Sequence, residues 1–337
     1  MAECLISIGS NLGNRWLVIE TALAELQANP AISLRRTSQQ HVTRPAGGPA
    51  GQDEFVNAAA LVGTSLQPVE LLDFLQSLES RAGRTRDVRW AARALDLDLL
   101  LYDDVVWNDE RLVLPHPRMA FRRFVLAPAV EVAPNMPHPL LGQSMAQLLA
   151  HLDHAANYVA ITGVPETAVT ELARAATTRV RAQGLLARAP AAQQSEASGG
   201  RSVEEELELL HNRCDLIRNV AFTGQSPYAI SDFWLEESLA HARELWPIEY
   251  HRVESAWLKR RQQVPAPKLL VFVEVTSDDD LCDRQKLSDS HKKSLLAVQR
   301  NLLEQMLAPG QPPNLRLNAA NPTWNEEEVV AAILAMS

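Results

Sequence analysis

The chain has 337 residues, of which 46% are hydrophobic, and its net charge is −9. This length favours two domains over one, and the acidic balance gives no support for general nucleic-acid binding, so any phosphate site must be a local basic pocket. Three widely spaced cysteines without a CxxC pair argue against a disulfide framework and a zinc site, and the lack of a membrane-length apolar run or a signal pattern predicts a cytoplasmic protein.

The first elements read as a short buried strand at residues 4–8, a glycine-rich turn at 9–14 and a helix at 16–26. Such a turn can offer backbone N–H groups to an anion, although many such turns only connect two elements. Residues 43–49 form a Pro/Gly-rich loop that composition alone assigns to a surface connection. Asn57 lies in the apolar strand predicted at 55–61, where either the backbone or a bound heterocycle can satisfy its amide.

Residues 68–82 have helical periodicity, with leucines on one face. Gln76 and Glu79 are expected to project away from that buried face, and Glu79 is interpreted as structural.

The segment 84–101 combines four arginines with two aspartates in an apolar run. Because side chains alternate along a strand, Asp96 and Asp98 should share one face, and Leu97 should point to the core. Two carboxylates can hold Mg²⁺, which usually takes substrate phosphates as further ligands, and arginines bind phosphates bidentately. The alternative is a solvated strand face whose acids are balanced by the arginines. The hypothesis is a magnesium–nucleotide site for phosphoryl-type transfer.

Three motifs carry a resemblance to a known family: Arg-Trp-Ala-Ala-Arg-Ala-Leu-Asp-Leu-Asp-Leu-Leu at 89–100, Gly-Ser-Asn-Leu-Gly at 9–13 and Leu-Val-Leu-Pro-His-Pro-Arg-Met at 112–119. Together they resemble the 6-hydroxymethyl-7,8-dihydropterin pyrophosphokinase family, which usually has Gly-Pro or Ala-Pro in place of Ala91 and Ala92. The resemblance covers residues 1–153. It implies an α+β, ferredoxin-like domain with a mostly antiparallel sheet.

The resemblance also implies the reaction, in which ATP donates a diphosphate to hydroxymethyl-dihydropterin in folate biosynthesis and AMP is released. Asp96 and Asp98 would hold two Mg²⁺ ions and act in catalysis with Arg84 and Arg93. The implied pterin-binding residues are Thr43, Ala46, Phe55, Asn57, Trp90 and Phe124. The implied ATP-binding residues are Gln76, Arg84, Arg89, Trp90, Arg93, Leu99, Arg111, His116 and Arg122. Without the resemblance, a lone histidine such as His116 is more often a structural residue.

The second half begins with a predicted strand at 158–162, a turn and a helix at 170–183. This is the context of a P-loop, but only Gly163 and Thr170 fit G-x-x-x-x-G-K-[ST], because Ala168 and Val169 replace the second Gly and the Lys. Glu166 adds a negative charge, so this turn should bind ATP poorly. Residues 184–202 read as a flexible insert. Helices at 204–220 and 326–336 and strands at 268–275 and 315–318 suggest a parallel sheet, with Ser231 or Asp232 as a helix cap.

Residues 157–337 are similar to the deoxynucleoside kinase family through the strand–turn–helix, the Ile-Ser-Asp-Phe at 230–233 and the Pro-Lys-Leu-Leu-Val at 267–271. The resemblance implies an α/β, P-loop kinase-like domain. The family's Glu-Pro, its acid–arginine pair near Asp232 and its arginine-rich lid, reduced here to residues 283–286, are missing or altered. An inactive kinase-like domain that serves dimerisation or regulation is favoured over one that still phosphorylates deoxynucleosides. The expected partners are small-molecule substrates and a second copy of the chain, without nucleic acid or membrane.

Overall fold

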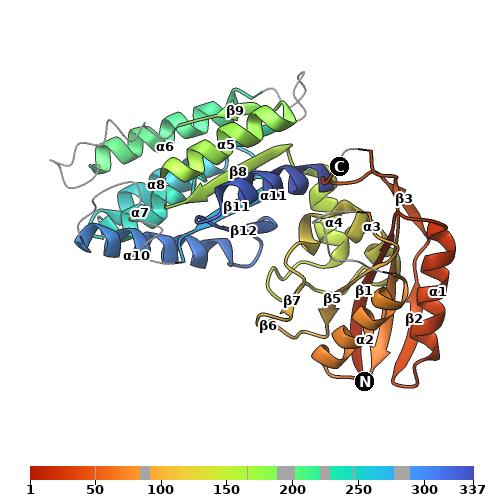
Figure 1. Ribbon diagram of the computed structural model, residues 1–337. Helices are drawn as coiled ribbons and strands as arrows, with labels where there is room; N and C mark the ends of the chain where they lie inside the picture. Colours follow the sequence, from red (N-terminus) through yellow and green to blue (C-terminus); the bar gives the residue numbers. More distant parts are fainter. Residues whose placement is uncertain are drawn as a thin grey trace. The chain divides into compact units, whose positions relative to one another are not determined.

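The computed structural model describes residues 1–49, 51–83, 92–164, 166–187, 202–220, 228–245, 247–276 and 289–337. It divides into two compact units, Met1–Asp153 with Ala331–Ser337 and His154–Val330 (Figure 1). The predicted domains, residues 1–153 and 157–337, stay a prediction, and residues 331–337 of the second are grouped with the first unit instead. Among the described helices, none is long and apolar enough to cross a membrane.

The first unit is built on an antiparallel sheet with the strand order β2-β4-β1-β5, and β3 pairs with β4 beyond the end of β2. This confirms the predicted mostly antiparallel sheet. The sheet strands are β1 (Ala2–Ser10), β2 (Ile32–Thr37), β3 (His41–Thr43), β4 (Phe55–Thr64) and β5 (Asp96–Tyr102). The remaining elements are α1 (Arg15–Ala28), α2 (Pro68–Arg81), the hairpin β6 (Trp107–Asn108) and β7 (Val113–Leu114), the 3₁₀ helix Met119–Phe121, α3 (Arg123–Val132) and α4 (Met145–His154).

The two faces of this sheet have different roles. Alternate residues such as Ile6, Ile8 and Leu97 pack with α1 and α2 in one core. The intervening residues of β1 and β5, among them Ser7 and Asp98, therefore point to the opposite face. The functional side chains of β5 are thus held on the face opposite the α1–α2 core.

Glu79 differs from its prediction. It lies in α2 but is only 2% exposed, and its carboxyl oxygen Oε1 accepts a hydrogen bond from the backbone N–H of Leu97 at 2.9 Å. An acid in a helix is assigned to the solvent side by periodicity, but this one is buried because a strand-edge donor satisfies it.

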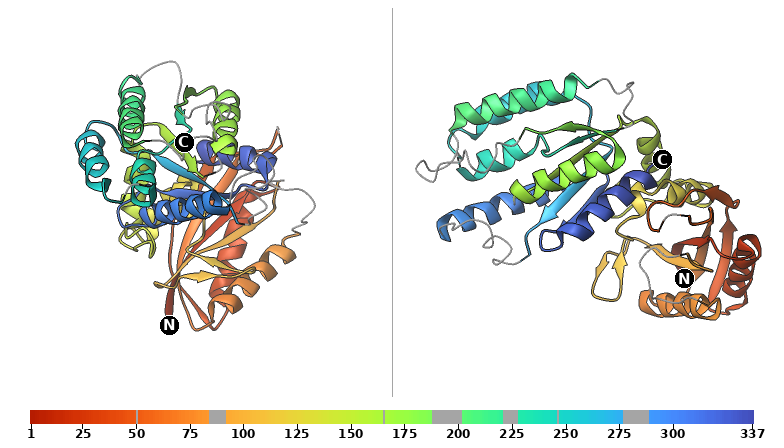
Figure 2. Two further views of the ribbon diagram at one scale, coloured as in Figure 1. Left: turned by 90° about the vertical axis from the view of Figure 1, so that its left-hand side faces the viewer. Right: turned by 45° about the horizontal axis from the view of Figure 1, so that its top comes forward.

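The second unit contains an all-parallel sheet with the order β12-β11-β8-β10-β9. This confirms the predicted parallel sheet, and Figure 2 shows helices on both of its sides. The strands are β8 (Tyr158–Gly163), β9 (Gln183–Leu185), β10 (Ala229–Ser231), β11 (Leu269–Glu274) and β12 (Asn314–Asn318). The helices are α5 (Glu166–Val180), α6 (Val203–Arg218), α7 (Glu237–Leu245), α8 (Tyr250–Arg261), α10 (Asp289–Met306) and α11 (Pro322–Ala335).

Two local predictions in this unit are wrong. Helix α7 begins at Glu237, so neither Ser231, which ends β10, nor Asp232 caps it. Gly184 and Leu185, the first residues of the predicted insert, belong to the strand β9 instead. At its other end Ser202 caps α6 by accepting the N–H of Glu205 at 3.3 Å. Residues 188–201 of the predicted insert lie outside the described residues.

Candidate active site

The two aspartates of β5 lie on one face of the first sheet, as predicted. In the register with β1, Asp96 lies opposite Gly9 and Asp98 opposite Ser7, while Leu97 between them is buried in the α1–α2 core. Both carboxylates remain partly accessible, with 25% and 30% of the side chain exposed. The strand therefore presents two neighbouring acids to solvent from a rigid, buried backbone.

Three basic side chains surround these acids. The Nη1 atom of Arg93 lies 2.6 Å from Oδ1 of Asp96. The Nη1 atom of Arg122 and the Nε2 atom of His116 each lie 3.8 Å from Oδ2 of Asp98. The structure thus brings together five of the predicted site residues. This mixture of groups is suited to a metal-bound polyphosphate. The carboxylates can bind the metal ion, and the guanidinium groups can bind the phosphates.

His116 is fixed by its own backbone and by a neighbouring amide. The backbone N–H of His116 donates to the carbonyl oxygen of Leu100 at 2.8 Å. The ring atom Nδ1 accepts from the backbone N–H of Arg118 at 3.2 Å. Because Nδ1 is an acceptor, the ring proton of the neutral imidazole belongs on Nε2, which faces Asp98. Burial lowers the pKa of His116 to about 4, against the opposing effect of Asp98 and with help from Arg122 and Arg118. At neutral pH the ring is an uncharged hydrogen-bond donor.

Arg122 connects the acidic edge to an aromatic ring. Its guanidinium carbon lies 5.6 Å from the ring centre of Phe124, in a cation–π contact. Burial lowers the pKa of Arg122, while the nearby Asp98 and Asp96 raise it. The residue predicted to bind phosphate therefore contacts the residue predicted to stack on the pterin.

Three of the six predicted pterin residues lie together on β3 and β4, which β1 separates from the acids of β5. Asn57 is 3% exposed, and its Nδ2 donates to Oγ1 of Thr43 at 2.7 Å. Thr43 in turn pairs with Phe55 in the β3–β4 register. Gly9 of β1 lies between Asn57 on β4 and Asp96 on β5, so the two halves of the site share one row of the sheet.

Asn11 holds the glycine-rich turn in place, a role that sequence reasoning missed. Its Oδ1 accepts the backbone N–H of Arg93 at 2.6 Å, and its own N–H donates to the Arg93 carbonyl at 3.0 Å. Its Nδ2 donates to Gln52 at 3.2 Å. An Asn within a Gly-rich turn is the signal that marks such a bridging role, because its side chain offers both a donor and an acceptor.

The remaining predicted residues are less directly placed. Arg111 lies on the surface, where its guanidinium contacts Asp73 of α2 at 2.5 Å. Leu99 is buried in the α1–α2 core, so its side chain points to the face opposite the two acids. Ala46 and Gln76 are partly buried, Ala46 in the loop after β3 and Gln76 in α2. Arg84, Arg89 and Trp90 lie outside the described residues.

The carboxylate oxygens of the site fit a hard cation that is bound by both the protein and a substrate. Within the described ranges, no group of three or more His, Cys, Asp or Glu side chains is placed to hold a metal ion. The two aspartates of β5 are a smaller set. Mg²⁺ is commonly bound in this way, by one or two carboxylates together with substrate phosphates and water.

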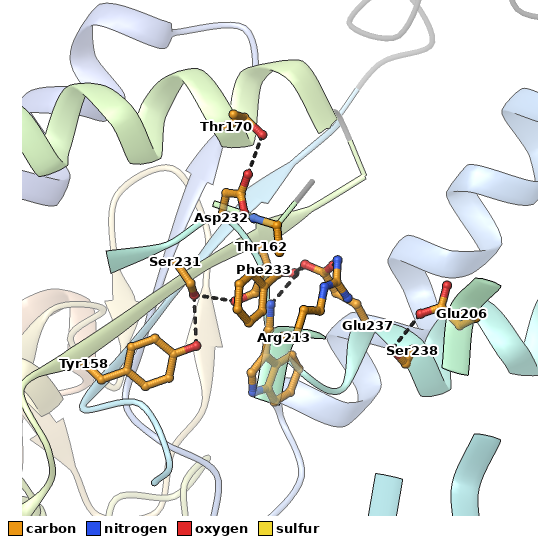
Figure 3. Close-up of polar contacts among 12 residues, drawn as sticks. Tyr158, Thr162, Thr170, Glu206, Arg213, Ser231, Asp232, Phe233, Glu237 and Ser238 are labelled. Carbon is orange, nitrogen blue, oxygen red and sulfur yellow. Dashed lines mark hydrogen bonds and ion pairs between the residues drawn. The ribbon is translucent and has the colours of Figure 1, made fainter. Parts of the chain in front are cut away.

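A second polar cluster lies at the carboxyl ends of β8 and β10 in the other unit (Figure 3). Arg213 and Glu237, both with 2% of the side chain exposed, form an ion pair of 2.8 Å, and Thr162 donates to the same carboxylate at 2.5 Å. The Arg213 guanidinium also lies 5.1 Å from the ring centre of Phe233. These groups are therefore engaged with one another.

The turn after β8 lacks the form of a P-loop. Helix α5 begins at Glu166, and Val169, at the position of the P-loop lysine, is fully buried. The hydroxyl of Thr170 donates to Asp232 at 2.8 Å, and the other carboxyl oxygen of Asp232 accepts the N–H of Ala187 at 2.9 Å. A buried carboxylate thus holds the hydroxyl that a P-loop turns toward magnesium.

Comparisons with known proteins match the two units separately. The family model described as 7,8-dihydro-6-hydroxymethylpterin-pyrophosphokinase (HPPK) matches residues 5–134. The chain is 38% identical to 2-amino-4-hydroxy-6-hydroxymethyldihydropteridine pyrophosphokinase of Methylorubrum extorquens, over 45% of this chain and 95% of that one. It is 42% identical to the Bacillus subtilis protein of the same name, over 38% of this chain and 75% of that one.

Among solved structures, a deoxyadenosine kinase from M. mycoides is similar at a TM-score of 0.39 and 9% identity, over 51% of this chain and 96% of that chain. The strand pairing of the second unit, and not this similarity, establishes its parallel fold. The first unit is similar to nearly the whole Methylorubrum protein. It also holds the aspartates, arginines and histidine of the site close together on β5 and around it. The chain therefore belongs to the 7,8-dihydro-6-hydroxymethylpterin pyrophosphokinase family of transferases.

Proposed function

We propose that the first unit transfers the terminal diphosphate of ATP to the hydroxymethyl group of 6-hydroxymethyl-7,8-dihydropterin at the acidic edge of β5. The pterin hydroxyl oxygen forms a bond to the β-phosphorus and loses its proton to solvent, the bond from that phosphorus to the α,β-bridging oxygen breaks, and AMP leaves with that oxygen. The observation that carries this proposal is the pair Asp96 and Asp98 on one face of β5, with Arg93, Arg122 and His116 within 4 Å of them.

Asp96 and Asp98 would hold two Mg²⁺ ions. Bound magnesium would neutralise the triphosphate and draw charge from the phosphorus that is attacked. Arg93 and Arg122 would bind phosphate oxygens when ATP takes the place of their present carboxylate contacts. The Nε2–H group of His116 would donate a hydrogen bond to a phosphate oxygen. The ring would be neutral, which is the state that its lowered pKa favours.

The pterin would lie along β4, beside the acids. The buried amide of Asn57 and the hydroxyl of Thr43, 2.7 Å apart, offer donors and acceptors to the edge of a flat heterocycle. Phe55 and Phe124 would supply the aromatic faces that hold the ring by stacking. Because Gly9 alone separates Asn57 from Asp96 across the sheet, the hydroxymethyl group would be carried toward the phosphate side.

The test is AMP release from ATP and Mg²⁺ with hydroxymethyl-dihydropterin, using the full chain. Asp98→Ala should lower kcat by at least about a hundredfold, because a preorganised charge at the reacting phosphates is lost. Asn57→Ala should chiefly raise KM for the pterin. Arg35→Ala, which removes an exposed pair with Glu3, is the control and should leave both constants unchanged. Pterin-dependent AMP release that survives Asp98→Ala would refute the proposed site.

For the second unit, we infer a non-catalytic role as an inactive kinase-like domain. The support is chemical: the P-loop lysine position is a buried valine, and Thr170 is held by Asp232. A phosphate approaching this turn would meet the buried carboxylate of Asp232 in place of a lysine, and like charges repel.

This role has two tests that use the full chain. In Asp98→Ala, where the first site is silenced, a panel of thymidine, deoxycytidine and deoxyadenosine with ATP should yield no ADP above background. ADP that depends on a nucleoside would establish the alternative, a bifunctional protein. Sedimentation of the full chain tests the proposed dimerisation: a dimer supports it, and a monomer at micromolar concentration contradicts it.

A further inference from the structure

Strand β5 lies at the edge of the first sheet, with β1 on one side only. Its other side must be satisfied by something other than a strand, because unpaired backbone groups at a buried edge are costly. Two contacts near the middle of the strand contribute to this in the described structure. The backbone N–H of His116 donates to the Leu100 carbonyl at 2.8 Å, and the Leu97 N–H donates to Oε1 of Glu79 at 2.9 Å.

The second of these contacts lies at the centre of the site. Leu97 is the single residue between Asp96 and Asp98, so its peptide groups connect the Cα atoms of both acids. Any rotation of the peptide between Asp96 and Leu97 moves the Asp96 carboxylate relative to the Asp98 carboxylate. The N–H of this peptide is the group that Glu79 holds. The acceptor comes from α2, whose Leu71 and Leu78 are packed in the core and give it a fixed position.

We infer that Glu79 is a positioning residue, which sets the relative placement of the Asp96 and Asp98 carboxylates through the Leu97 amide. It touches neither substrate nor metal in this role. The inference rests on the proposed function of the two aspartates as magnesium ligands. Residues that orient metal ligands typically change metal affinity or activity by about 10–100-fold when they are removed.

The burial of Glu79 distinguishes this role from a helix-stabilising one. A structural acid in a helix is normally exposed and pairs with bases three or four residues away. Glu79 instead is 2% exposed and reaches a backbone donor eighteen positions along the chain. Burial of a carboxyl group is costly unless it is hydrogen-bonded, and the contact with the Leu97 N–H supplies such a hydrogen bond.

The first experiment measures hydrogen exchange at the Leu97 amide by NMR, without metal or substrate. Since no described strand pairs with the side of β5 that faces away from β1, Glu79→Ala should speed exchange at Leu97 more than about tenfold, relative to amides in the β1–β4 pair. Glu79→Gln keeps a side-chain oxygen that can accept the N–H, and should retain most of the protection. The control is Leu75→Ala, which removes a fully buried side chain of the same helix and costs about 2–5 kcal/mol of stability without removing the acceptor.

The second experiment measures the Mg²⁺ dependence of AMP release in the same variants. Glu79→Ala should raise the Mg²⁺ concentration for half-maximal rate about tenfold and lower kcat, with KM for the pterin within about twofold. Glu79→Gln should restore most of the wild-type Mg²⁺ dependence. Leu75→Ala should lower thermal stability but leave the Mg²⁺ dependence unchanged.

The outcomes separate the inference from the proposed function. An unchanged Mg²⁺ dependence in Glu79→Ala, combined with loss of activity in Asp98→Ala, would overturn the inference and leave the aspartates as ligands. A shift in Leu75→Ala as large as that in Glu79→Ala would also overturn it, because general loosening of α2 would then be the cause. Retention of activity in Asp98→Ala would refute the proposed function itself.

Discussion

The Oδ1 atom of Asn57 lies 3.1 Å from the position that a β-carbon on Gly9 would occupy. The same β-carbon would lie 3.9 Å from Cβ of Asp96, so a side chain at this point would stand between the pterin half and the phosphate half of the site. Gly9 has no positive φ that only glycine adopts, so its role here is the close approach of these side chains.

Gly9→Ala should therefore weaken catalysis without unfolding the sheet. The added methyl group forces the Asn57 amide to move by a few tenths of an ångström, and we expect KM for the pterin to rise about tenfold, since small misplacements at a reacting centre are costly. Steady-state kinetics with the pterin and ATP varied separately measure this effect. Gly184→Ala in β9 is the matched control, because its β-carbon would meet Thr177 at an ordinary 3.4 Å. A change confined to KM for ATP would contradict the assignment of Asn57.

His116 should remain uncharged throughout the physiological pH range. Burial lowers its pKa to about 4, and burial also lowers the pKa of His138 to about 4. Both rings should therefore show no midpoint near pH 6.5 in an NMR titration of the folded protein, whereas both should titrate near 6.5 in urea. A folded-state midpoint above pH 6 for His116 would contradict the neutral-donor role.

The same two histidines should make the first unit less stable in acid. Their pKa values are lower in the folded protein than in the unfolded chain, so the unfolded chain takes up protons first as the pH falls. Their contribution to the free energy of unfolding is full above pH 6.5 and is lost as the pH falls from 6.5 to about 4, by up to about 3 kcal/mol for each ring. His138→Gln should reduce the fall in melting temperature over this range. An unchanged fall would show that other groups cause it.

The sequence predicted what depends on local periodicity. Asp96 and Asp98 share a face because side chains alternate along a strand, and Leu97 between them is buried on the other face. Glu79 escaped prediction because its partner is a backbone N–H, eighteen residues away, that has no sequence signature. Arg213 escaped prediction for the same reason. It lies in an acid-rich helix that reads as solvent-exposed, and the partner that offsets its buried charge, Glu237, lies twenty-four residues later.

The buried pair of Arg213 and Glu237 should therefore show strong coupling. Removing one partner leaves an uncompensated charge in a site that is 98% covered, and we expect Glu237→Gln or Arg213→Met alone to cost about 3–5 kcal/mol of stability. The double variant should recover a large part of this loss, because no isolated charge remains. Urea unfolding followed at the second unit gives the four values of the cycle. Additive effects of the two changes would contradict the coupling.

Glu236, next to this pair, should give the second unit a pH dependence of the opposite sign to that of the histidines. Burial raises its pKa to about 7, although Arg261, whose Nε lies 3.3 Å from Oε1, opposes the shift. The folded unit therefore holds a proton that the unfolded chain releases near pH 4.5. The stability that this provides is full below pH 4.5 and is lost as the pH rises from 4.5 to about 7.

Glu236→Gln, which stays neutral at every pH, should remove this dependence. Relative to wild type, it should gain up to about 3 kcal/mol at pH 8 and nothing at pH 4.5, because the wild-type residue is ionised at the higher pH and protonated at the lower one. Calorimetry of both proteins across this range measures the difference, and Glu244→Gln, at an exposed position of helix α7, which begins directly after Glu236, serves as the control. An equal gain at both pH values would mean that packing, and not ionisation, distinguishes the glutamine. A loss at pH 8 would mean that the contact with Arg261 outweighs the cost of burying the charge.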